Sequence, residues 1–141
     1  MSKCIGWREW VSLPGLGIKR IKAKVDTGAK TSSIHARDIE VFKEKNTRWV
    51  RFRIYASPAF KKSPILAQAK LVDYRRVKSS SGHVSQRPVI RTVIMLSDRA
   101  WLIELTLTNR AEMGFPMLLG REAIKKRFLV DPDKSFLQGR P

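Results

Sequence analysis

An aspartate at the end of an apolar strand is the first feature of this sequence that could do chemistry. Asp26-Thr27-Gly28-Ala29 comes directly after the alternating segment Ile21–Val25. The carboxylate of Asp26 can transfer a proton or activate a water molecule. Gly28 permits a tight turn that brings backbone N–H groups close to that carboxylate, and the Thr27 hydroxyl can brace the loop. An ordinary Asx turn would use the same residues, so the triplet alone leaves both interpretations open.

A second segment, late in the chain, carries a complementary pattern. Met117-Leu118-Leu119-Gly120-Arg121 is an aliphatic run that leads into a predicted helix from Arg121 to about Arg127. Through Asp-Thr-Gly-Ala early and Leu-Leu-Gly-Arg late, the sequence resembles the retroviral-type, or retropepsin-like, aspartic proteases. In that family the strand that carries the aspartate lies beside a later hydrophobic-hydrophobic-Gly-Arg segment that opens the C-terminal helix.

The stretch from Ala23 to Ala36 is similar to a bacterial family usually labelled ATP-dependent zinc proteases, which is associated with a ribosomal-protein glutamate ligase of the ATP-grasp class. Two further pieces of that family are present, Ser81-Gly82-His83 and Arg87-Pro88-Val89-Ile90. The resemblance covers nearly the whole chain and implies a single retropepsin-like domain over residues 1–141. The expected fold is mainly β, a closed or partly closed β-barrel of the acid-protease type with one short C-terminal helix.

The resemblance implies that Asp26, Thr27 and Gly28 form a catalytic loop. Two carboxylates share a proton in such enzymes, and together they activate water and protonate the peptide carbonyl. No other aspartate here is followed by Thr-Gly, so a homodimer must supply the second Asp26. The substrate contacts expected from the resemblance are Ala29, Lys30, Ser81, Gly82, His83 and Gly120. Arg121 is expected to tie the helix to the active-site strand or the dimer interface, although a solvated arginine would fit its position equally well.

The flap, the hairpin that covers the substrate in retroviral enzymes, is predicted between Ser79 and Gln86. The run Ser79–His83 has the composition of a hairpin tip. Retroviral enzymes place the flap soon after the aspartate, whereas here two or more predicted strands intervene. An ordinary exposed hairpin is an equal alternative.

Zinc and nucleotide sites find little support in the residues themselves. A catalytic zinc usually has three protein ligands. The histidines and cysteines of the chain are Cys4, His35 and His83, without a His-Glu-x-x-His or Cys-x-x-Cys motif. There is also no Gly-x-x-x-x-Gly-Lys-Ser/Thr loop for phosphates. The sequence therefore predicts no metal and no cofactor.

Short strands of alternating polarity must position these residues. The apolar residues at 21, 23 and 25 share one face of a predicted strand, and Lys22 and Lys24 share the other. The same analysis predicts strands at Trp49–Tyr55, Ala67–Val77, Val89–Leu96 and Trp101–Thr108. Many short strands with one late helix favour a closed or partly closed barrel.

The chain is strongly basic, with 29 Lys and Arg against 12 Asp and Glu and a formal net charge of +17. Such a charge attracts polyanions. Because Lys22, Lys24 and Lys30 flank the Asp-Thr-Gly motif, an acidic substrate is one hypothesis. The association of the similar bacterial family with a ribosomal-protein glutamate ligase implies a glutamate-tailed ribosomal protein as that substrate. The first competing hypothesis is a β-barrel that binds nucleic acid or the ribosome through charge and exposed aromatic residues such as Trp7, Trp10, Trp49 and Trp101. The second is an inactive protease fold that acts as a dimeric interaction module, and a zinc hydrolase ranks third.

The N-terminal residues lack the apolar run of a signal peptide. No apolar run approaches the roughly 20 residues of a membrane helix. A single cysteine, Cys4, cannot form an intrachain disulfide. These features predict a cytoplasmic protein without membrane association.

Overall fold

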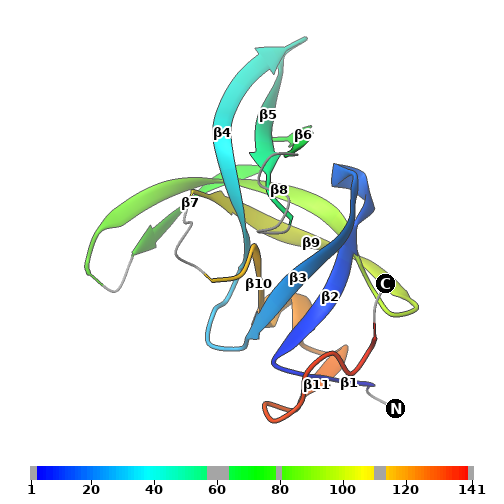
Figure 1. The fold of residues 1–141 in the computed structure, drawn as a ribbon. Helices are drawn as coiled ribbons and strands as arrows, with labels where there is room; N and C mark the ends of the chain where they lie inside the picture. The colour runs from blue at the N-terminus through cyan, green and yellow to red at the C-terminus, as the bar shows by residue number, and fades with distance from the viewer. Residues whose placement is uncertain (1–2, 57–63, 79–80, 110–113, 140–141) are drawn as a thin grey trace.

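The computed structural model describes residues 3–56, 64–78, 81–109 and 114–139, and strands dominate them (Figure 1). The strands are β1 (Lys3–Ile5), β2 (Arg8–Leu13), β3 (Ile18–Asp26), β4 (Ser32–Glu44), β5 (Thr47–Ile54), β6 (Ile65–Lys70), β7 (Asp73–Lys78), β8 (Val84–Leu96), β9 (Arg99–Thr108), β10 (Met117–Gly120) and β11 (Phe128–Val130). The helical segments are the 3₁₀ turn η1 (Pro14–Leu16) and the helix α1 (Arg121–Ile124). Neither of these described helices is long and apolar enough to cross a membrane.

Six strands form a closed ring of hydrogen bonds, in the order β10, β3, β2, β8, β9, β4 and back to β10. Beyond the ring, β5 and β6 extend the sheet from β4, and β7 pairs with β8. A separate parallel pair joins β1 to β11. The prediction of a mainly β fold with a closed or partly closed sheet and one short C-terminal helix is confirmed.

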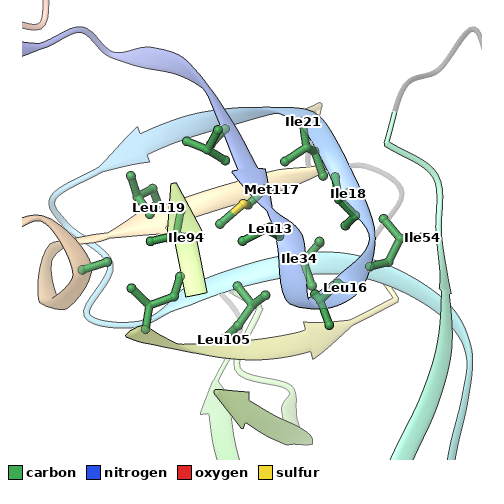
Figure 2. Close-up of a cluster of buried hydrophobic side chains, with 14 of the residues drawn as sticks. Leu13, Leu16, Ile18, Ile21, Ile34, Ile54, Ile94, Leu105, Met117 and Leu119 are labelled. Carbon is green, nitrogen blue, oxygen red and sulfur yellow. The ribbon is translucent and has the colours of Figure 1, made fainter. Parts of the chain in front are cut away.

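The two-residue alternation of the sequence determines which face of each ring strand packs inward. In β3, Ile21, Ala23 and Val25 are buried while Lys24 is exposed. Figure 2 shows the side chains that meet inside the ring, among them Leu13, Ile21, Ile34, Ile94, Leu105, Met117 and Leu119. Fully burying one such aliphatic side chain contributes about 1.5–3 kcal/mol, so this cluster is the main source of the ring's stability.

Two details of the predicted elements are wrong. The segment Ala67–Val77, predicted as one strand, is divided between β6 and β7 because Leu71 and Val72 bond to different neighbours. Their backbone N–H groups donate to the carbonyls of Arg48 and Val89, respectively. The helix ends at Ile124 rather than near Arg127, because Lys125 is extended (ψ 144°) and Lys126 has a left-handed φ of 67°.

Candidate active site

β10 lies between β3 and β4 and closes the ring at the candidate site (Figure 1). Its parallel register with β3 places Gly120 opposite Asp26. Its antiparallel register with β4 places Leu118 opposite Ser33. The loop from Thr27 to Thr31 must therefore pass around the end of β10, which brings the two segments singled out in the sequence together.

The Asp26 carboxylate is held by the backbone of its own loop. Gly28 N–H donates to Asp26 Oδ1 at 3.0 Å, and Ala29 N–H donates to the Asp26 carbonyl at 3.2 Å. Asp26 itself is half-buried, whereas Thr27 and Gly28 are exposed. The Asx turn considered from the sequence is thus present, and it orients a carboxylate next to an exposed loop tip.

Gly120 lies buried beneath this loop. A Cβ at Gly120 would come within 2.7 Å of the Thr31 carbonyl carbon and 3.0 Å of the Ala29 carbonyl oxygen. Since both are backbone atoms, no side-chain rotation could relieve the overlap. The Gly120 N–H donates to Ser32 Oγ at 3.0 Å. Only glycine therefore allows β10 to approach the loop this closely.

Arg121 connects the start of α1 to the same loop. One of its guanidinium nitrogens lies 3.3 Å from each of the Thr27 and Gly28 carbonyl oxygens. Its backbone N–H donates to the Ala29 carbonyl at 2.8 Å, and the Glu122 N–H donates to the Lys30 carbonyl at 3.1 Å. The carbonyls of the loop are thus held by the residues that follow Gly120.

Three polar residues that the sequence analysis missed, Arg75, Glu104 and Ser32, make further contacts around the loop. Arg75 of β7 donates to Thr31 Oγ1 at 3.1 Å and forms an ion pair with Glu104 of β9 at 3.0 Å. Ser32 is buried and accepts from Gly120. The hydroxyl residues Thr31, Ser32 and Ser33 follow the motif, but their types alone do not indicate a structural role. No sequence pattern links Arg75 to Thr31.

A cavity of about 420 Å³ opens beside the loop, between α1 and β9. Its charged lining residues are Lys30, Arg75, Lys125, Arg127, Glu104 and Glu122. Lys125 lies 2.6 Å from Glu122, and its hydrogen bond lowers the pKa of that exposed carboxyl. Cations therefore outnumber carboxylates in this cavity, and Lys30 lines it.

The predicted hairpin tip joins β7 to β8, which pair from Asp73 opposite Val89 to Lys78 opposite Val84. Ser81, Gly82 and His83 are exposed at this tip, and Gly82 has a φ of 85°. Residues 79 and 80 of the predicted flap lie outside the described part of the chain. Along the chain, β5 and β6 lie between β4 and this hairpin. Strands between the aspartate and the flap are also what the sequence predicts.

The candidate metal ligands lie on three different elements: Cys4 on β1, His35 on β4 and His83 at the β7–β8 tip. Among the described residues, no three side chains of the His, Cys, Asp and Glu types gather in a way that could hold a metal ion.

The tryptophans expected to be exposed are partly buried, so that expectation is wrong. Trp7 meets Phe115 edge to face with ring centroids 5.8 Å apart. Trp10 stacks on Phe136, and Trp101 Nε1 donates to the Ala123 carbonyl at 3.1 Å. Trp7, Trp10 and Trp101 pack against residues late in the chain, contacts that the sequence does not predict.

Comparison with known proteins agrees with this fold. The family model described as "Retropepsin-like aspartic endopeptidase RimB" matches residues 4–141. A crystal structure of a protein with unknown function from Legionella pneumophila superposes with a TM-score of 0.81 at 31% sequence identity, covering 98% of this chain and 99% of that chain.

Curated relatives are named "Probable alpha-L-glutamate ligase". The relative from Shewanella halifaxensis is 48% identical over 136 residues, which is 96% of this chain and 30% of the relative. The relative from Desulfotalea psychrophila is 48% identical over 130 residues, which is 92% of this chain and 28% of that protein. The chain thus spans less than a third of the length of these curated relatives.

Proposed function

Because this chain belongs to the RimB-like family of retropepsin-like aspartic endopeptidases, we propose that it is one subunit of a homodimeric aspartic endopeptidase. The observation that carries the proposal is the arrangement around Asp26. Its carboxylate accepts from Gly28 N–H at the end of β3, and its loop is bound to Gly120 and Arg121. A loop fixed on both sides is suited to hold a reactive carboxylate in one orientation.

The second carboxylate comes from another copy of the chain. The exposed Thr27–Gly28 tip can meet its equivalent across a two-fold axis, because such an interface uses the same surface of both subunits. The two Asp26 side chains then share one proton. One carboxylate removes a proton from the attacking water while the other donates a proton to the peptide carbonyl. The resulting tetrahedral intermediate breaks down to an acid and an amine.

In this assignment the remaining predicted residues either line the path of the substrate or support the loop beside it. Ala29 and Lys30 continue the catalytic loop, and Lys30 also lines the neighbouring cavity. The β7–β8 hairpin acts as the flap through Ser81, Gly82 and His83. Gly120, buried beneath the loop, supports the loop that contacts the substrate. No metal and no nucleotide are required for this chemistry.

An acidic polypeptide is the substrate that the charge favours. The net charge of +17 raises the local concentration of a glutamate-rich chain near the protein. The curated relatives carry the name of a glutamate ligase. We therefore propose that the enzyme cleaves glutamate-rich tails such as those added to a ribosomal protein.

A subunit-mixing experiment tests the paired carboxylates. Hydrolysis of a glutamate-tailed peptide is followed by mass spectrometry for the wild type, for Asp26→Asn and for an equal mixture of the two after subunit exchange. Asp26→Asn should be inactive. If each site needs two copies of Asp26, only about a quarter of the mixed dimers are intact, so activity per wild-type subunit falls by about half.

Three results would contradict the proposal. Undiminished cleavage by Asp26→Asn would show that another group does the chemistry. Unchanged activity per wild-type subunit in a mixture shown to exchange would mean that one chain is sufficient. If the wild type cleaves nothing although its two Asp26 carboxylates meet, an inactive protease fold that serves as a dimeric interaction module would replace the enzyme.

A further inference from the structure

The outward side of β2 and β3 carries a group of cations and aromatic rings, which we call the basic face. Its members are Arg8, Trp10, Arg20, Lys22, Lys24 and Phe136. In the β2–β3 register Trp10 lies opposite Lys22, and Arg8 lies opposite Lys24. The face is continuous with the candidate site because β3 ends at Asp26.

Aromatic rings hold three of the four cations in place. Trp10 and Phe136 are stacked, with ring centroids 5.7 Å apart and an interplanar angle of 19°. The Arg20 guanidinium lies 4.5 Å from the Trp10 centroid, and that of Arg8 lies 5.0 Å from the Phe136 centroid. Lys22 Nζ lies within 5.9 Å of both rings. Cations placed over rings in this way keep their charge and lose little further freedom when an anion binds.

These cations have no carboxylate partner in the part of the chain that the structure describes. Among the ion pairs between described residues, none includes Arg8, Arg20, Lys22 or Lys24. The neighbouring carboxylate of Glu9 is buried and accepts from backbone N–H groups instead. On the β4–β5 hairpin, by contrast, arginines of β5 pair with Glu40 and Asp38. The basic face therefore presents positive charge that the protein itself does not neutralise.

The spacing of the cations matches an extended chain. Lys22, Lys24 and Asp26 are two residues apart on the same face of β3, a separation of about 6.6–6.8 Å. Alternate side chains of an extended peptide repeat at the same distance. A glutamate-rich segment lying along β3 can therefore place alternate carboxylates against Lys22 and Lys24, and its next residues reach Asp26.

We infer that the basic face is the binding surface for an extended acidic polypeptide and delivers that chain to Asp26. This inference rests on the proposed function for the delivery step, whereas the binding step stands by itself. A single-stranded nucleic acid fits less well. Base stacking needs an open ring, and Trp10 is already stacked on Phe136 with Arg20 over it.

The test is direct binding, measured in an Asp26→Asn background so that the peptide is not cleaved. The probes are a fluorescein-labelled oligoglutamate, an oligoglutamine of equal length and a single-stranded RNA. The test variant combines Arg20→Gln with Lys22→Gln. The matched control combines Lys43→Gln with Lys45→Gln, which removes the same charge from exposed residues of the β4–β5 hairpin tip. Lys24→Gln is a second test variant because its exposed side chain is not packed on a ring.

We expect the Arg20/Lys22 variant to raise the Kd for oligoglutamate about tenfold or more, and the Lys43/Lys45 control to change it less than about twofold. Lys24→Gln should weaken binding in the same direction, and oligoglutamine should bind poorly to every variant. Equal weakening by test and control variants would overturn the inference, because net charge alone would then explain binding. Loss of RNA binding with oligoglutamate binding intact would also overturn it.

Cleavage assays separate this inference from the proposed function. If the protein binds oligoglutamate through the basic face but the wild type cleaves no peptide, the endopeptidase assignment fails and the binding surface stands. If the wild type cleaves acidic peptides equally well with and without Arg20 and Lys22, the basic face is not the route to Asp26. The expected result is a raised KM for the acidic peptide with kcat retained.

Discussion

Gly120 and Asp26 lie opposite each other in the parallel register of β10 and β3. The two residues come from the only Leu-Leu-Gly-Arg and Asp-Thr-Gly segments of the chain. Their juxtaposition means that the loop carrying the candidate carboxylate is shaped by a strand that is distant in the sequence. Variants in that strand should therefore change the loop without touching Asp26.

Gly120→Ala should destabilise the protein by roughly 1–3 kcal/mol or more, which is typical of overpacking in a close-packed interior. The new methyl group would overlap the backbone of Thr31 and Ala29, which cannot rotate away. Urea denaturation measures the change in the free energy of unfolding. Gly15→Ala is the control, because a Cβ there would meet only the Thr92 hydroxyl, at 3.1 Å. Equal losses in both variants would contradict the close approach of β10 to the loop.

Arg121→Lys should loosen the Thr27–Gly28 tip while keeping the charge. A lysine cannot reproduce the planar guanidinium that lies between two carbonyls, and a typical lost hydrogen bond costs about 0.5–1.5 kcal/mol. Faster amide hydrogen exchange in residues 27–30 would report the change. Arg48→Lys, at an exposed arginine of β5, should leave that exchange unaltered. Unchanged protection in Arg121→Lys would mean that its side chain does not order the loop.

Arg75→Gln should separate the β7–β8 hairpin from the loop after Asp26. The substitution removes the bond to Thr31 Oγ1 and the ion pair with Glu104. Because Arg75 is partly exposed, we expect a loss in stability of no more than about 1 kcal/mol, with increased hydrogen exchange at residues 31–32. Arg91→Gln is a close control, since Arg91 contacts the other oxygen of Glu104 at 3.4 Å. The same response in both variants would indicate a general effect of unpairing Glu104.

Glu9→Gln should release the C-terminal segment. The buried Glu9 carboxylate accepts from the N–H groups of Gly6, Leu137 and Gln138 at 2.7, 2.9 and 3.2 Å. The NH₂ group of a glutamine side chain is a donor and would face these backbone N–H donors. We therefore expect the free energy of unfolding to fall by roughly 2–4 kcal/mol. Chemical denaturation and hydrogen exchange at residues 137–138 measure it. Glu40→Gln, which removes an exposed ion pair, should cost less than about 1 kcal/mol. A similarly small loss of stability for Glu9→Gln would mean that its carboxylate does not hold the C-terminal segment.

The sequence could predict the parts of the site that depend on residue type and spacing. Glycine at position 120 and the Asp-Thr-Gly turn leave a signature because few residues can replace them. The alternation in β3 predicts which of its residues are buried. The resemblance to retropepsins then supplies the relation between the two segments, which periodicity alone does not contain.

Other features depend on packing that no local pattern encodes. The buried Glu9 and Ser32 have ordinary surface chemistry, and their partners lie far away in the chain. The break between β6 and β7 falls at Leu71 and Val72, two apolar residues of which Val favours strands, without glycine or proline to mark it. Tertiary hydrogen bonds override local propensity at these positions.

The threading of β10 also sets an order of events during folding. The bond between Arg121 and Thr27 joins residues 94 positions apart, so the loop around Asp26 cannot be completed until the late strand has been synthesised. Contacts of such long range form slowly, because a large loop of chain must close first. While β10 is still being translated, β3 and β4 leave an open place in the ring, and Asp26 lacks its support. A growing chain therefore lacks the support of the Asp26 loop until β10 and Arg121 have emerged.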